Sequence, residues 1–131
     1  MYKRQLVRAA ETAKTIKKTF NKEQNIVFDD NLLEVDLSEW SGLKVDEIKN
    51  KFPEIYPIWK NDPENLVLKR NDNKTYKPIQ DLFFQATNFV ENILKIYQDK
   101  DDINILVVGH NAILRCLIPV SYTHLTLPTT R

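Results

Sequence analysis

The sequence is poor in cysteine, has no strong excess of either charge and contains no long apolar run. One cysteine among 131 residues excludes an internal disulfide framework and is compatible with a reducing compartment, so a cytoplasmic protein is expected. The formal net charge is +1 and no basic stripe alternates with aromatic residues, which argues against nucleic acid as a partner. No run of ~18 apolar residues occurs, so no membrane span is expected.

Metal-binding patterns are absent as well. No group of carboxylates and histidines has the spacing of metal ligands, so neither a metal nor another cofactor is expected. Apolar residues make up 42% of the chain, which is enough for a hydrophobic core, and the length fits one domain or most of one.

Both ends of the chain are interpreted as non-native. Residues 1–5 and 120–131 resemble translations of a transposon end and an adapter used in sequencing libraries, and a natural Thr-rich tail is the alternative for the second segment. Such segments are set aside before the fold is considered, which leaves residues 6–119 as the domain. His110 is then the one candidate functional histidine, because His124 lies in the excluded tail.

The residues between these ends alternate between helical and strand patterns. Helices are predicted at residues 6–20, 45–52, 78–97 and 112–118. Short apolar runs predict strands at 26–28 and 103–108, the second with the β-branched composition of a buried parallel strand. The polar stretch 61–77 predicts a long surface insertion. This order of elements indicates an α/β domain built in layers.

His110 comes directly after the second predicted strand and a glycine. Ligands of open α/β sheets bind beyond the carboxyl ends of the strands, and the free N–H groups of a following helix favour an anion there. A cationic imidazole at this point can hold a phosphoryl oxygen. The alternative is a histidine that only caps or packs at the end of the strand.

Other segments hold further candidates. Arg8 lies near the start of the first predicted helix, where the helix dipole disfavours a cation unless an anion is bound nearby; a solvated arginine is the alternative. Glu34 lies between two apolar residues and is either a partly buried general acid or a solvated loop residue. Trp40 is expected to anchor the core, and Cys116 to be a buried, inert thiol.

Three ordered motifs together resemble those of the histidine phosphatase superfamily, which includes the cofactor-dependent phosphoglycerate mutases. Residues 6–13 resemble its motif R-A-x-[QE]-T-A. Residues 32–42 resemble L-x-E-x-x-x-G-x-W-x-G, and residues 108–115 resemble V-x-H-x-x-x-x-R. Ser38 departs from the second motif, because it stands where the family has glycine.

The resemblance implies a fold, an activity and a set of site residues. The fold would be a three-layer α/β/α domain with a mostly parallel sheet. The activity would be phosphoryl transfer from a small phosphomonoester through a phosphohistidine. Glu34 corresponds to the proton donor and His110 to the second catalytic histidine, while Arg8 and Asn111 correspond to phosphate-binding positions. A phosphatase is expected; a mutase and a non-catalytic phosphate-binding or regulatory module are the alternatives.

The first catalytic segment of that family is not found in the sequence. Members begin with a strand that ends in R-H-G, whose histidine attacks phosphorus, and the 131 residues contain no such tripeptide. The natural upstream part is therefore expected to have been cut away. In that case the sheet lacks its first central strand, and the chain by itself is expected to be inactive.

Overall fold

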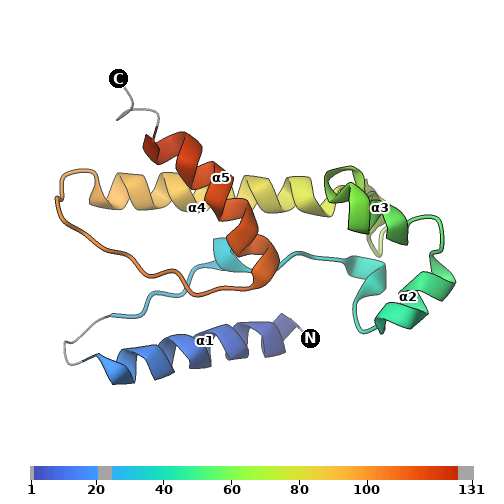
Figure 1. The fold of residues 1–131 in the computed structure, drawn as a ribbon, viewed down its shortest axis with the longest axis horizontal. Coiled ribbons are helices and arrows are strands. Elements are labelled where there is room, and N and C mark those ends of the chain that lie inside the picture. Colours follow the sequence, from blue (N-terminus) through green and yellow to red (C-terminus); the bar gives the residue numbers. More distant parts are fainter. Residues whose placement is uncertain (1, 21–24, 127–131) are drawn as a thin grey trace.

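The structure is a computed structural model that describes residues 2–20 and 25–126. Met1, the polar break at residues 21–24 and the tail residues 127–131 lie outside the described residues. Helices predominate, and two extended segments run between helix α1 on one side and helices α4 and α5 on the other (Figure 1).

The described residues contain helices at all four positions predicted from the sequence. The α-helices are α1 (Tyr2–Thr19), α2 (Val45–Lys51), α3 (Tyr56–Asn61), α4 (Pro78–Tyr97) and α5 (Asn111–Thr126). Short 3-10 helices are η1 (Asp30–Leu32), η2 (Ser38–Trp40) and η3 (Pro63–Asn65). Helix α5 is longer than expected, because it continues through Pro119. No described helix has the length and apolar character needed to cross a membrane.

The main core lies where α5 crosses α4 (Figure 1). Helix α4 begins at Pro78, whose fixed φ suits the first helical position, and it carries the apolar stripe predicted from its periodicity. The buried residues of this core are Ile79, Leu82, Ala86, Phe89, Val90, Ile113, Cys116 and Leu117. Since the buried stripe runs along much of α4, this helix supports both α5 and the segment that contains η1.

A second core surrounds Trp40, which is 3% exposed. Its ring lies 6.0 to 6.3 Å from the rings of Phe52, Tyr56 and Trp59. The prediction that Trp40 anchors the core is confirmed. Trp59 also packs against the α4–α5 core, so the two clusters are joined.

The mostly polar stretch 61–77 is largely exposed, as expected of a surface insertion, but it also contains a short hairpin and two buried residues. Strands β1 (Leu68–Lys69) and β2 (Thr75–Tyr76) pair antiparallel within it. Leu66 and Leu68 are 0% and 2% exposed, and both pack in the Trp40 core. The two buried leucines and the hairpin were not predicted, because two apolar residues with strand-like spacing of two were outweighed by the many polar residues around them.

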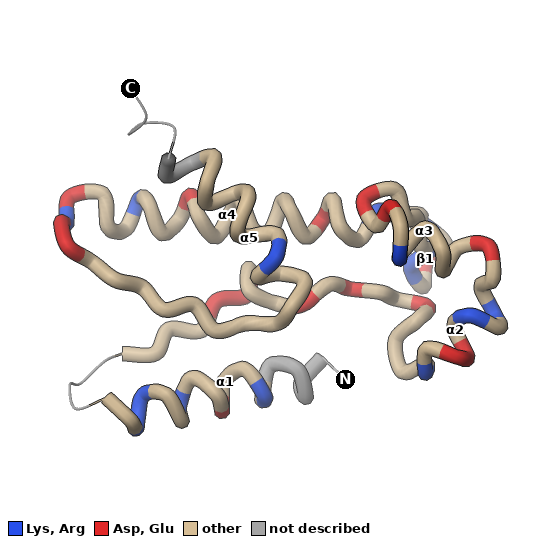
Figure 2. The backbone as a smooth tube through the Cα atoms, in the orientation of Figure 1, with Lys and Arg blue, Asp and Glu red and all other residues tan. Residues whose placement is uncertain are grey.

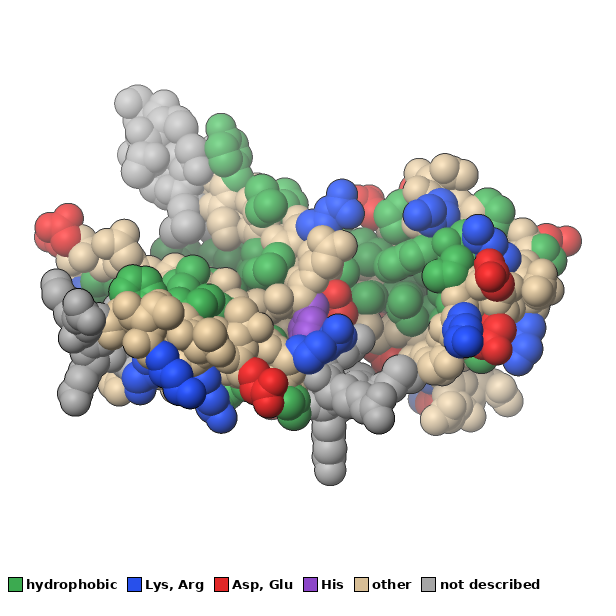
Figure 3. All heavy atoms as spheres, turned by 60° about the horizontal axis from the view of Figure 1, so that its bottom comes forward, with side chains coloured by type: hydrophobic (Ala, Val, Ile, Leu, Met, Phe, Trp, Pro, Cys, Tyr) green, Lys and Arg blue, Asp and Glu red, His purple; other side chains and the backbone are tan. Residues whose placement is uncertain are grey.

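The expected parallel sheet is likewise not seen in the part of the chain that the structure describes. Residues 26–28 and 103–108 are extended but pair with no strand, and the sheet that is described is the antiparallel β1–β2 pair. A strand needs the N–H and C=O groups of a neighbour to form a ladder. Without one, Val27 and Leu106 stay 79% and 66% exposed. Figure 3 shows apolar side chains exposed between charged ones on the side where α1 lies.

Charge is distributed unevenly along the chain. Helix α1 carries several lysines and one acidic residue, Glu11, whereas residues 29–39 contain five acidic residues and no basic one. Figure 2 shows this contrast between α1 and the extended segment that follows it. The acidic segment 29–39, which contains the candidate residue Glu34, therefore lies next to the basic helix α1.

Candidate active site

The site is built around the carboxylate of Glu34. Its Oε2 accepts a hydrogen bond from the backbone N–H of Ala112 at 3.1 Å, and its Oε1 accepts one from Ile113 at 3.0 Å. The first N–H groups of a helix have no partner within the helix, and a carboxylate is favoured there by the helix dipole. Half-buried Glu34 therefore joins the second sequence motif to the start of α5, which belongs to the third.

His110 lies at the same end of α5. It directly precedes the helix, and its carbonyl accepts the backbone N–H of Leu114 at 3.0 Å. His110 is half-buried, and Asn111, the first residue of α5, is exposed. Since Glu34 bonds the N–H groups two and three positions after His110, the structure brings the expected proton donor and the expected second histidine to one end of one helix.

Gly109 packs on the first turn of α5. A Cβ atom at this position would lie 3.4 Å from Cδ2 of Leu114 and 3.5 Å from Cγ2 of Ile113, which are ordinary van der Waals distances. The residue before His110 is therefore in close contact with the start of the helix.

Arg8 is not joined to this centre. It is exposed on α1, and its guanidinium makes no hydrogen bond or ion pair with any residue that the structure describes. Val7 on the same helix is 50% exposed and Phe20 just after it is 49% exposed, so the apolar face of α1 is incompletely covered. The convergence of Arg8 with His110 stays a prediction.

Sequence reasoning missed Gln85 of α4. Its side-chain Nε2 donates to the carbonyl oxygens of Asn31 at 3.0 Å and of Leu33 at 2.7 Å. The signal was present, because Gln85 is a polar residue three positions after Leu82 and four before Phe89, on the buried stripe of the helix. A polar side chain at such a position needs buried partners, and here the partners are carbonyls of the segment that holds Glu34.

Arg70 fastens the β1–β2 hairpin to the same acidic segment. Its guanidinium lies 3.0 Å from Oδ2 of Asp81, 3.9 Å from Oδ2 of Asp36, and 4.2 Å from the ring centre of Tyr76. The Tyr76 hydroxyl donates to the Asp36 carbonyl at 2.8 Å. Burial, together with the negative charge of Asp36, raises the pKa of Tyr76 to about 12.

Ser38 adds a second link to the hairpin. Its hydroxyl donates to the carbonyl of Lys69 at 2.8 Å, and Glu39 accepts the Lys69 backbone N–H at 2.9 Å. Ser38 has a φ of 36°, in the left-handed region that glycine adopts readily and that residues with a Cβ atom rarely adopt. The departure from the family motif is therefore accommodated with backbone strain, which the hydrogen bond to Lys69 offsets.

Cys116 is a buried thiol, as expected, and is 5% exposed. Burial raises its pKa to about 11, and the charges of Glu34 and Glu64 act in the same direction. Since the thiolate is the reactive form, Cys116 has the properties of an inert core residue.

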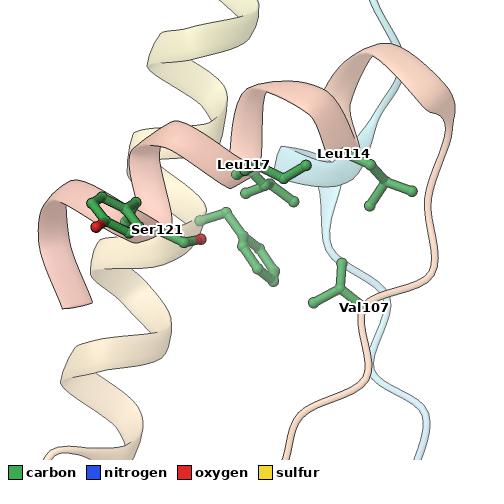
Figure 4. Close-up of a pocket in the computed structure, with 7 residues that line it drawn as sticks. Val107, Leu114, Leu117 and Ser121 are labelled. Atoms are coloured by element: carbon green, nitrogen blue, oxygen red, sulfur yellow. The ribbon is translucent and has the colours of Figure 1, made fainter. Parts of the chain in front are cut away.

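An apolar pocket lies between α5, α4 and the extended segment that contains Val107. Figure 4 shows Val107, Leu114, Leu117 and Ser121 around it, and its remaining lining residues are Phe89, Ile118 and Tyr122. These side chains offer hydrophobic contact but no acid or base for phosphoryl chemistry. In the described part of the chain, no group of three or more His, Cys, Asp or Glu residues is placed to hold a metal ion.

Comparison with known proteins identifies the family of the chain. The sequence model of the histidine phosphatase superfamily (branch 1) matches residues 2–125, and the chain therefore belongs to this superfamily. It is a superfamily of enzymes, and its fold is of the α/β class.

Three curated relatives carry phosphatase names. The chain is 32% identical over 113 residues to a probable 2-carboxy-D-arabinitol-1-phosphatase of Arabidopsis thaliana, covering 86% of this chain and 21% of the relative. It is 24% identical over 117 residues to phosphoserine phosphatase 1 of Hydrogenobacter thermophilus, covering 89% and 51%. It is 28% identical over 116 residues to 2-carboxy-D-arabinitol-1-phosphatase of Triticum aestivum, covering 88% and 21%. The chain thus spans between about a fifth and a half of the length of these relatives.

Proposed function

We propose that this chain carries the proton-donating and phosphoryl-stabilising part of a phosphatase site whose reaction passes through a phosphohistidine. The observation that carries the proposal is the contact of Glu34 with the first turn of α5, directly after His110. A proton donor and a phosphoryl-binding group must both contact the same bound phosphomonoester. The contact between Glu34 and the first turn of α5 supports such an arrangement.

The proposed reaction has two steps. A histidine on a segment outside these 131 residues attacks phosphorus in line, the bond from phosphorus to the ester oxygen breaks, and Glu34 gives that oxygen its proton. In the second step water attacks phosphorus, the bond from phosphorus to histidine nitrogen breaks, and the Glu34 carboxylate takes the proton of the water. His110, Arg8 and the backbone N–H of Asn111 hold the phosphoryl oxygens throughout.

The substrate class proposed is a small phosphorylated metabolite with an alkyl leaving group. The names of the relatives refer to phosphoserine and to a 1-phosphate of 2-carboxy-D-arabinitol, a carboxylated sugar alcohol, and both are phosphate esters of alkyl hydroxyls. An alkoxide is a poor leaving group, so a positioned proton donor has most effect on such esters. The single cysteine supports the cytoplasm as the compartment.

We also propose that residues 103–108 are a parallel strand in the complete domain, within an α/β/α arrangement of three layers. Their β-branched composition, their extended backbone and the exposure of Ile105 and Leu106 support this proposal. The matching proposal for the ends is that residues 1–5 and 120–131 are not native. The genomic sequence around this coding region checks both, since it should supply an upstream R-H-G segment and a different downstream sequence.

Activity assays test the proposed function. The chain as printed should show no turnover of a chromogenic phosphomonoester, because it contains no R-H-G segment. The restored enzyme, meaning the chain with an upstream R-H-G segment and without the two proposed non-native ends, should form an acid-labile, base-stable phosphoenzyme. Turnover by the printed chain that survives both Arg8→Ala and Glu34→Gln would show that the site is misassigned.

A further inference from the structure

We propose that Gln85 is a positioning residue that holds Glu34 against the first turn of α5. The inference rests on the proposed function only for its catalytic consequence, since the placement itself is a structural matter. Gln85 touches neither the Glu34 carboxylate nor α5 in any described hydrogen bond, and it acts through the backbone before Glu34.

Both hydrogens of the Gln85 side-chain amide are used on this backbone. Nε2 donates to the Leu33 carbonyl at 2.7 Å, directly before Glu34, and to the Asn31 carbonyl at 3.0 Å in η1. An amide nitrogen has two hydrogens, so the two carbonyls satisfy its donor capacity. The chain immediately upstream of Glu34 is therefore fixed at two points to α4.

The chain downstream of Glu34 is fastened to the same helix. Asp36 faces the guanidinium of Arg70, which pairs with Asp81 of α4 at 3.0 Å. Asp81 and Gln85 are four positions apart and hence on one face of α4. One face of α4 thus holds the segment on both sides of Glu34. Asp81 does so through Arg70, whereas the half-buried side chain of Gln85 contacts the segment directly.

These anchors determine where the Glu34 carboxylate can reach. The segment from residue 33 to 36 is extended and lies in no helix or strand, so it has no ladder of its own to fix its position. Loss of the Gln85 donors leaves two carbonyls in a half-buried position without their partners. The backbone must then move toward water, and the carboxylate moves away from the N–H groups of Ala112 and Ile113.

Hydrogen exchange on the full 131-residue chain tests this placement without any need for turnover. Gln85→Leu should speed exchange of the Ala112 and Ile113 amides about tenfold, because the protection of a helix N-terminal amide depends on its local acceptor. The Leu117 amide in the middle of α5 should keep its rate. Gln80→Leu is the matched control, since Gln80 is an exposed glutamine on the same helix, and it should change none of these rates.

Glu34→Ala provides the reference for complete loss of the acceptor. In that background, Gln85→Leu should produce no additional acceleration at Ala112 and Ile113. If Gln85→Leu prevents folding, Gln85→Glu replaces the donor group with an acceptor of nearly the same shape and should give the same selective acceleration, with Gln80→Glu as its control. Unchanged rates at both amides overturn the proposal, and so does an equal acceleration of all three α5 amides, which is the signature of general destabilisation.

A kinetic comparison separates this inference from the proposed function. In the restored enzyme, Gln85→Leu should lower kcat/KM for an alkyl phosphate more than for an activated aryl phosphate, as expected for a displaced proton donor. If Glu34→Gln shows no such preference, the role proposed for Glu34 is wrong, although the exchange result stands. If Glu34→Gln shows this preference but Gln85→Leu lowers kcat/KM equally for both substrates, Gln85 is not a positioning residue.

Discussion

The carboxylate of Glu34 accepts a hydrogen bond at 3.0 Å from the backbone N–H of Ile113, 79 positions further along the chain. Ile113 is itself 0% exposed in the core between α4 and α5. The position of the acid is therefore tied to the packing of the two helices, because a shift of α5 on α4 moves the acceptor and its donors apart. The geometry of the candidate site therefore depends on the packing of the helix core and not only on the loop around Glu34.

Ser38 provides a test of the strained position in the second motif. Ser38→Ala keeps the φ of 36° unfavourable and removes the hydrogen bond to Lys69, so it should lower the free energy of unfolding by about 1 kcal/mol. Ser38→Gly also removes the bond but relieves strain of about 1 kcal/mol, so it should be within ~0.5 kcal/mol of the parent. Urea unfolding of both variants measures the difference, with Ser41→Ala as an exposed control. Equal losses of unfolding free energy for Ser38→Ala and Ser38→Gly would contradict the backbone strain at this position.

Tyr76 should make stability depend on alkaline pH. Its folded pKa of about 12 exceeds the ordinary value of 10.0, so its contribution to the free energy of unfolding is complete below pH 10 and is lost as pH rises toward 12. The parent should therefore lose stability over this interval faster than Tyr76→Phe. The variant should also be about 1 kcal/mol less stable at pH 8, because it lacks the hydrogen bond to Asp36.

Chemical unfolding at several pH values measures both effects of Tyr76→Phe. Tyr122→Phe is the control, since Tyr122 is 71% exposed. Parallel stability curves for the parent and Tyr76→Phe between pH 10 and 12 would show that the hydroxyl titrates in the folded protein as it does in the unfolded chain.

Cys116 should resist thiol reagents in the folded protein. It is 5% exposed, and its pKa of about 11 leaves little thiolate at pH 8. We expect its rate of reaction with a disulfide reagent at pH 8 to be roughly one hundredth of the rate in denaturant, since the thiolate fraction and access both fall. A folded-state rate equal to the denatured rate, in protein whose circular dichroism is native, would contradict the buried position.

The helical part of the fold was predictable because its signals are local. The stripe on α4 and Pro78 at its first position specify that helix without reference to the rest of the chain. The pairing of the strands was not predictable, because it depends on a neighbouring strand that a local sequence pattern does not identify. Residues 103–108 have the composition of a buried strand and are extended, yet they have no strand partner among the described residues.

The candidate site was predictable in part for a similar reason. Glu34 and His110 were recognisable from motif spacing, and the structure brings their segments together at the start of α5. The place of Gln85 on the buried stripe of α4 was visible in the sequence, but its partners were not, because they are backbone carbonyls 52 and 54 positions away. The roles of Glu34, His110, Arg8 and Asn111 are predictions that only chemistry can test.

The measurement that tests the account most directly is kcat/KM of Glu34→Gln in the restored enzyme on two substrates, an alkyl phosphate and an activated aryl phosphate. Protonation by a general acid is worth ~10²–10⁴-fold where the leaving oxygen is strongly basic, and far less where it leaves as a stable anion. Glu34→Gln should therefore slow the alkyl phosphate by about that factor and the aryl phosphate little. His110→Ala should slow both, because it acts on the phosphoryl group they share. Equal losses on the two substrates for Glu34→Gln would contradict its role as the proton donor.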